Sequence, residues 1–159
     1  MMNAQTAKQV FEATGFNKTL GSMDKLEEMG FELESWSASN SLIKEAKSLY
    51  NPLDDAKVGD GVTVHYYTDS DAGTVIARTE KTLTIQMDKA TLLNKDELEF
   101  HVGGFAAHCS NQRVQKYSYE RNEEGQILKV SRRKNGDYVV QKSTNLVTAG
   151  RNKFYDYNF

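Results

Sequence analysis

A chain of 159 residues has the length of one ordinary domain, or of one domain with an appended arm. Hydrophobic residues make up 38% of it and charged residues 26%, so the core is modest, and the chain either is rich in loops or buries apolar surface against a partner chain. A single cysteine, Cys109, excludes an intrachain disulfide framework and suits a reducing cytoplasm, and no apolar run is long enough to span a membrane.

Three helices are predicted before the single proline, Pro52, because apolar residues recur there about one turn apart. Gly15 is expected to end the first helix and Gly30 the second, while Ser22 is expected to cap the start of the second. The sequence around Pro52 is expected to stop the third. The predicted helices cover about residues 7–14, Met23–Met29 and Asn40–Tyr50.

The third predicted helix carries an apolar stripe at helical spacing. With two residues of the first helix, this stripe exceeds what a small barrel needs to cover, so we predict that residues 1–52 form a helical assembly segment. The chain is then expected to form a homo-oligomer, either a dimer or a larger assembly. The residues of this predicted interface are Val10, Phe11, Leu42, Ile43, Ala46, Leu49 and Tyr50.

After Pro52 the hydrophobic period changes from helical to two, which indicates β-strands. The first three predicted strands lie close together, as in a small SH3-like or KOW-like barrel, with turns expected at Asp69–Gly73 and Thr79–Lys81. The stretch Ala90–Ser110 is predicted to be a long, functional loop. The fold class is therefore predicted to be α+β, with N-terminal helices followed by a mainly antiparallel, barrel-like domain over residues 53–159. The predicted strands are residues 62–67, 75–78, 82–87, Gln112–Glu120, Ile127–Arg133, Asp137–Gln141 and Lys153–Phe159.

Motifs for metal binding and catalysis are missing from the sequence. His108 and Cys109 are adjacent, so in an extended chain they point to opposite faces and do not share one ion. The chain contains no nucleophile elbow, no phosphate-binding glycine loop and no dinucleotide fingerprint. We therefore expect a protein that is not an enzyme and that carries no metal or cofactor.

The net charge of −2 is divided unevenly along the chain. Residues 1–110 hold 10 Lys and Arg against 17 Asp and Glu, whereas residues 111–159 hold 10 against 5. The overall balance argues against a protein that wraps long duplex DNA. Within the basic third, arginines that can bind phosphate alternate with aromatic residues that can stack on bases, although solvated hairpins would show the same composition. This mixture includes Arg113, Lys116, Tyr117 and Tyr119, then Lys129 and Lys134, and finally Lys153, Phe154 and Tyr155.

Several short segments resemble the phage Thoeris anti-defence sponge family, whose members sequester cyclic ADP-ribose isomers made by bacterial TIR enzymes. These segments are Lys57–Asp69, Gly73–Ile76, Gly103–Ala106, Ser110–Gln112, Arg133–Gly136 and Gly150–Phe159. The resemblance implies helical N-terminal segments that mediate assembly and a β-rich remainder that holds the ligand. It also implies a pocket with a Phe, an Asn and two arginines. The matching residue types here are Phe105, Asn111, Arg132, Arg133 and Arg151, and the assignment among them is open.

The resemblance thus predicts a non-catalytic sponge for a small cyclic nucleotide, acting in the cytoplasm of an infected bacterium without nucleic acid or membrane partners. Two rivals remain open. One is a protein-binding module that inhibits a host protein. The other is a phosphodiesterase that degrades the signal, which the missing metal motif and acid–base pair disfavour.

Overall fold

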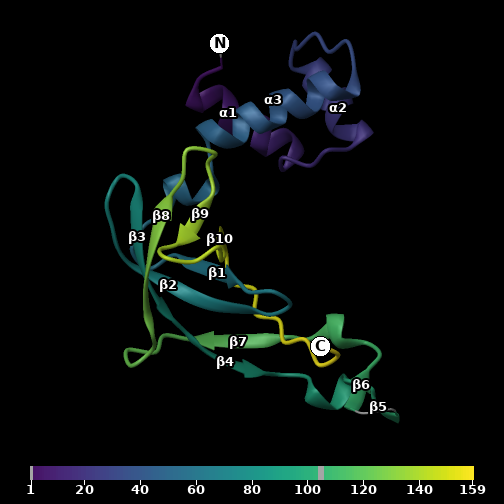
Figure 1. Ribbon diagram of the computed structural model, residues 1–159, viewed down its shortest axis with the longest axis vertical. Coiled ribbons are helices and arrows are strands. Elements are labelled where there is room, and N and C mark those ends of the chain that lie inside the picture. The colour runs from purple at the N-terminus through teal and green to yellow at the C-terminus, as the bar shows by residue number, and fades with distance from the viewer. Residues whose placement is uncertain (1, 104–105) are drawn as a thin grey trace. The chain divides into compact units, whose positions relative to one another are not determined.

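A computed structural model describes residues 2–103 and 106–159 (Figure 1). Its contacts divide the chain into two units. The helical unit contains the chain up to Asp55 together with the short segment Arg132–Asp137, and the β unit contains Ala56–Ser131 and Tyr138–Phe159. The predicted α+β class is confirmed, because N-terminal helices are followed by antiparallel strands that close into a barrel.

The three helices begin at side-chain caps and are longer than predicted. The prediction that Ser22 caps the second helix is wrong, because the Thr19 hydroxyl accepts the Ser22 N–H at 3.1 Å and starts the helix earlier. Gly15 ends the first helix as predicted, in the left-handed conformation with φ 60°. The helices are α1 (Ala4–Thr14), α2 (Leu20–Glu28) and α3 (Trp36–Leu49), and a 3-10 turn follows at Pro52–Asp55.

The apolar stripe that was expected to face a partner chain packs inside the helical unit. Val10, Ile43 and Ala46 are fully buried there, in one cluster with residues of α1 and α2. Leu42 and Leu49 are partly buried and pack against the same cluster. The stripe therefore does not by itself require a second chain, and assembly stays a prediction.

The β unit is built on a closed antiparallel barrel with the strand order β1-β10-β9-β8-β3-β2. Alternating apolar side chains fill its interior, and Val75 lies opposite Ile85 while Leu83 lies opposite Val130. The predicted meander of the first three strands is present. The barrel strands are β1 (Gly61–His65), β2 (Ser70–Arg78), β3 (Thr82–Met87), β8 (Ile127–Arg132), β9 (Tyr138–Val140) and β10 (Leu146–Ala149).

The region predicted to be one long loop instead includes the strands β5 (Phe100–Gly103) and β6 (Ala106–Cys109) and most of β4 (Lys89–Leu92), which belong to two ribbons. One ribbon pairs β4 with β7 (Tyr117–Glu120), and the other pairs β5 with β6. The turn expected at Asp69–Gly73 also lies earlier, because the Tyr66 N–H already bonds to the Asp69 carbonyl and β2 starts at Ser70. Short 3-10 turns occupy Lys95–Glu97 and Gln112–Val114.

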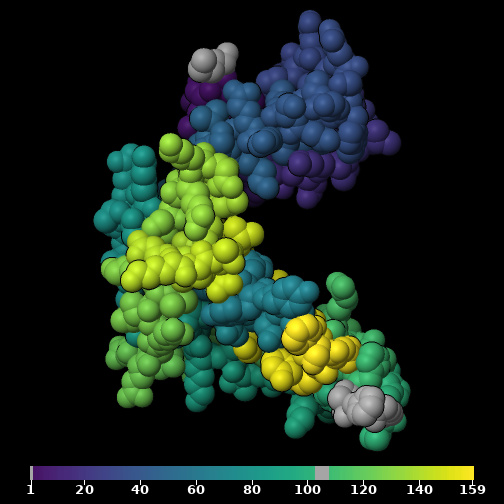
Figure 2. Space-filling model, in the orientation of Figure 1, coloured from purple at the N-terminus to yellow at the C-terminus, as the bar shows by residue number. Residues whose placement is uncertain are grey.

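The prediction of a last strand over Lys153–Phe159 is wrong. Phe154 makes a single bridge with Ser70, and β10 is the strand that closes the barrel. The C-terminal residues are nevertheless held in place, because the Asn158 side chain bonds to both the N–H and the carbonyl of Cys109. Figure 2 shows these residues, in yellow, lying on the surface next to the green segments of the β unit. No helix within the described residues is long and apolar enough to cross a membrane.

Candidate functional site

A depression of about 450 Å³ lies in the β unit where three segments far apart in the sequence meet. One segment follows β1, one is the 3-10 turn Gln112–Val114, and one is the C-terminal stretch after β10. We call it the C-terminal pocket, and its lining residues are Thr68, Gln112, Arg113, Asn152, Phe154 and Asp156. Its volume lies within the range of about 300–1,000 Å³ typical of ligand pockets.

Hydrogen bonds from neighbouring backbone hold the C-terminal wall of this pocket. The Ser70 and Phe154 backbones exchange two hydrogen bonds of 2.9 and 3.0 Å, and the Asn152 N–H donates to Thr63 Oγ1 at 2.8 Å. Opposite them, Gln112 donates to Asp156 Oδ1 at 3.0 Å and accepts from a backbone N–H further along the C-terminal stretch. The bonds to Ser70 and Thr63 use backbone atoms of Asn152 and Phe154, and both residues line the pocket.

Arg113 follows Gln112 directly in the 3-10 turn and is exposed. Its guanidinium makes no hydrogen bond or ion pair with any residue that the structure describes. The same holds for the Thr68 hydroxyl and the Asn152 side-chain amide in the described part of the chain. Such convergent polar groups beside an aromatic ring are the usual composition of a small-molecule site.

Of the ligand residues predicted from the sequence, Arg132 is the last residue of β8 and Arg133 follows it in the tip between β8 and β9. Both belong to the segment Arg132–Asp137 of the helical unit. Arg132 Nε donates to Asp54 Oδ1 at 2.8 Å, and Nη2 donates to the Ser48 carbonyl at 3.1 Å. Arg132 therefore neutralises a carboxylate and satisfies a free carbonyl in the last turn of α3. The Arg133 N–H donates to the Asp137 carbonyl at 2.7 Å within the same tip.

Two further predicted residues lie in the β unit and are used internally. Arg151 donates from Nε to Asp88 at 2.7 Å and from Nη2 to Thr74 at 2.7 Å. The Asn111 side chain accepts the Glu99 N–H at 2.8 Å and donates to the Glu97 carbonyl at 2.9 Å. Phe105 lies outside the described residues. Arg132 and Arg133 thus belong to the helical unit and Asn111 and Arg151 to the β unit. The role of the predicted residues in binding stays a prediction.

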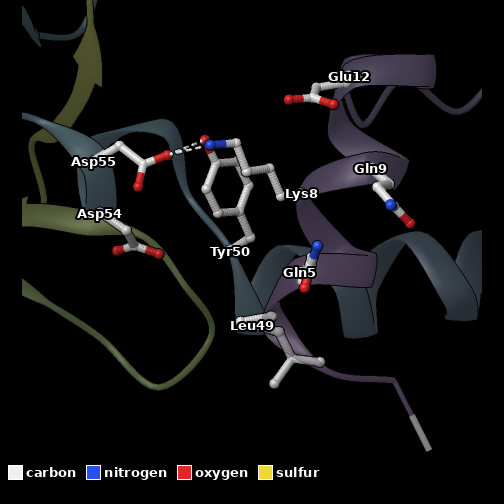
Figure 3. Close-up of a pocket in the computed structure, with 9 residues that line it drawn as sticks. Gln5, Lys8, Gln9, Glu12, Leu49, Tyr50, Asp54 and Asp55 are labelled. Atoms are coloured by element: carbon white, nitrogen blue, oxygen red, sulfur yellow. Dashed lines mark hydrogen bonds and ion pairs between the residues drawn. The ribbon is translucent and has the colours of Figure 1, made fainter.

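A second depression, of about 550 Å³, lies in the helical unit between α1 and the segment that follows α3 (Figure 3). Lys8 Nζ and the Tyr50 hydroxyl both donate to Asp55 Oδ2 at 3.0 Å. Burial and this carboxylate raise the pKa of Tyr50 to about 12. The Lys8 ammonium group already pairs with Asp55, which also lines this groove. The groove therefore offers an anionic ligand less unpaired positive charge than the C-terminal pocket does. Its lining residues are Ala4, Gln5, Lys8, Gln9, Glu12, Leu49, Tyr50, Asp54 and Asp55.

Within the described residues, no group of three or more His, Cys, Asp or Glu side chains is placed to hold a metal ion. Comparison of the chain with protein-family models, with curated proteins and with solved structures finds no match.

Arg113 and Phe154 belong to the basic and aromatic third of the sequence, but only their residue types point to a pocket. The alternation predicts Arg113 in a strand over Gln112–Glu120, whereas the strand begins at Tyr117 and Arg113 lies in the turn before it. The decisive property, a guanidinium without a partner among the described residues, is visible only in the folded chain.

Proposed function

We propose that the protein is a non-catalytic sponge that binds and sequesters a cyclic ADP-ribose-type signal and thereby blocks Thoeris defence. The observation that carries the proposal is that Arg113, whose guanidinium has no partner among the described residues, lines one pocket with Phe154. A pyrophosphate must keep partners for its charge when it leaves water, and a guanidinium fork supplies them. An aromatic face can add about 1–3 kcal/mol of stacking on a base. The sequence resemblance supplies the ligand class.

Sequestration sets a quantitative demand on this pocket. A sponge depletes its ligand stoichiometrically, so its Kd must lie below the concentration at which the signal activates its effector. Each tenfold decrease in Kd needs about 1.4 kcal/mol of binding free energy. Pre-organisation contributes to this free energy because a held wall loses little entropy on binding. The hydrogen bonds that fix Gln112, Asn152 and Phe154 supply such pre-organisation.

The direct test is calorimetric titration of the protein with cyclic ADP-ribose isomers made by a TIR enzyme. Arg113→Ala should weaken binding by about 10- to 100-fold, because hydrogen bonds to charged groups contribute about 1.5–3 kcal/mol. Lys116→Ala is the matched control, since it removes the same charge from an exposed position a few residues away, outside the pocket. Equal binding by the wild type and Arg113→Ala would place the site elsewhere.

The fate of the ligand separates a sponge from an enzyme. After incubation with the signal, the protein is heat-denatured and the supernatant is analysed by mass spectrometry. A sponge returns the signal with unchanged mass, whereas a phosphodiesterase returns a hydrolysed product. Failure of the wild type to remove any TIR product from solution would refute the proposal as a whole.

One observation favours the second candidate, a protein-binding module. Tyr67 is 90% and Phe159 83% exposed, and their rings pack edge to face with centroids 5.6 Å apart. Exposed aromatic pairs are typical of the anchors of protein interfaces. The two candidates differ in cells that carry a TIR-based defence. Arg113→Ala should reduce protection of the phage if the protein is a sponge, whereas Tyr67→Ser with Phe159→Ser should reduce it if the protein is a module.

A further inference from the structure

The C-terminal pocket contains a carboxylate as well as a guanidinium. Asp156 lines it, and Asp156 Oδ1 accepts two hydrogen bonds, from Gln112 Nε2 at 3.0 Å and from the Asn158 N–H at 2.9 Å. Asp156 Oδ2 has no partner among the described residues. The Asp156 N–H is also engaged, because it donates to Asp69 Oδ1 at 2.6 Å. The residue is therefore held at its backbone and at one oxygen, while the other oxygen has no partner in the described part of the chain.

A free carboxylate oxygen limits what the pocket can bind. A bare phosphate would bind Arg113 but would be repelled by the negative charge of Asp156. A ligand that brings its own hydrogen-bond donors meets both groups at once. A ribose hydroxyl is such a donor, and carboxylates hydrogen-bond ribose hydroxyls in the dinucleotide-binding folds. Because the oxygen is already positioned, the bond forms without ordering a flexible side chain.

We propose that Asp156 Oδ2 accepts a hydrogen bond from a ribose hydroxyl of the ligand, and that this bond selects ribosyl phosphates over simple phosphates. The inference rests on the proposed function, because it assigns a specificity residue to the same pocket. Arg113 binds the phosphate and Asp156 recognises the sugar. The pocket should therefore discriminate against a nucleotide that keeps its pyrophosphate and base but lacks the recognised hydroxyl.

The variant Asp156→Asn is matched closely to this geometry. Its amide oxygen can keep the two bonds that Asp156 Oδ1 accepts, while its amide nitrogen replaces the free acceptor with a donor. Binding is measured by calorimetry with three probes: cyclic ADP-ribose, its analogues that each lack one ribose hydroxyl, and inorganic pyrophosphate. Pyrophosphate has no hydroxyl to recognise, so it reports the phosphate side of the pocket alone.

The wild type should bind one deoxy analogue about 10- to 100-fold more weakly than cyclic ADP-ribose. Asp156→Asn should lose this discrimination and bind both ligands as weakly as the wild type binds that analogue. It should bind pyrophosphate at least as tightly as the wild type does, which also shows that the pocket is folded.

Two outcomes overturn the inference while leaving the proposed function intact. In the first, the wild type binds cyclic ADP-ribose and all its deoxy analogues equally, a result that needs no variant. In the second, Asp156→Asn binds cyclic ADP-ribose normally or keeps the discrimination. A wild type that binds neither cyclic ADP-ribose nor any TIR product contradicts the proposed function itself, so the two failures are distinguishable.

Discussion

Replacing Arg151 by Ala should destabilise the β unit rather than remove a ligand contact. Asp88, its partner, has a side chain that is only 1% exposed, whereas the Arg151 side chain is 30% exposed. Asp88 accepts hydrogen bonds from Arg151 and from Thr74, each of 2.7 Å. Without the arginine, the buried Asp88 carboxylate keeps its hydrogen bond from Thr74 but loses its positive partner. Leaving a buried charge uncompensated strongly lowers the free energy of unfolding.

The magnitude follows from the burial of the pair. Removing one partner of a fully buried ion pair costs about 3–5 kcal/mol, and a hydrogen bond to a charged group contributes about 1.5–3 kcal/mol. Because the Arg151 side chain is 30% exposed, the loss should fall below the value for a fully buried pair, and we expect about 2–3 kcal/mol. Arg113→Ala, at an exposed position without a partner, should change the free energy of unfolding by less than about 0.5 kcal/mol.

The assay is urea denaturation of the wild type, Arg151→Ala, Asp88→Asn and the double variant. The double variant should lose less stability than the two single variants together, because both remove the same interaction. Gly61→Ala offers an independent check, since its added Cβ would lie 2.6 Å from Arg151 Cγ and would displace the side chain. If Arg151→Ala is as stable as Arg113→Ala while binding of the cyclic nucleotide falls, Arg151 is a ligand residue and this reasoning is refuted.

Three further predictions concern the helical unit. Gly136→Ala should lower the free energy of unfolding, measured by urea denaturation, by several kcal/mol more than Gly30→Ala does. Both glycines have φ above 90°, so both substitutions strain the backbone. Only the Cβ at position 136 would clash, because it would lie 1.7 Å from the Lys47 carbonyl oxygen. Tyr50 should ionise in an absorbance titration only near pH 12. The pKa of Tyr50 in the folded state lies above the unfolded value of about 10. The contribution of this shift to stability is therefore complete below pH ~10 and is lost between pH ~10 and ~12. Tyr50→Phe should remove this loss. Thr19→Ala should lower the free energy of unfolding by about 1 kcal/mol in the same urea denaturation, because it removes the N-cap of α2.

The features that the sequence predicted well depend on neighbouring residues. Gly15 ends α1 because a left-handed residue is needed there, and Pro52 follows α3 because proline disfavours a helix in the residue before it. The strands β1, β2 and β3 follow a period of two that a short window reveals. The cap of α2 is misplaced by the sequence because Thr19 and Ser22 are both capping residues three positions apart, and the intrinsic preference for serine over threonine favours the wrong one.

The features that the sequence did not predict depend on pairing across long separations. Arg151 meets Asp88 across 63 positions, and Arg132 meets Asp54 across 78. Phe154, Tyr155 and their neighbours have strand-like alternation, yet side-chain bonds to other loops take the place of a ladder. No local window contains those partners. The composition of the basic third was therefore informative about chemistry, but it did not distinguish structural arginines from an unpaired one.

That distinction carries the functional argument. A binding site must be held in position and yet keep its binding atoms free. In the C-terminal pocket, one set of atoms makes the bonds that hold the site, and another set is left to bind a ligand. Gln112, the Asp156 N–H and the Asn158 N–H form the internal bonds. The guanidinium of Arg113 and Asp156 Oδ2 are left without partners among the described residues. Arg132 and Arg151 meet only the first condition, because strong internal bonds occupy their guanidinium groups. A phosphate would have to displace those bonds at either of them, whereas at Arg113 it displaces only water.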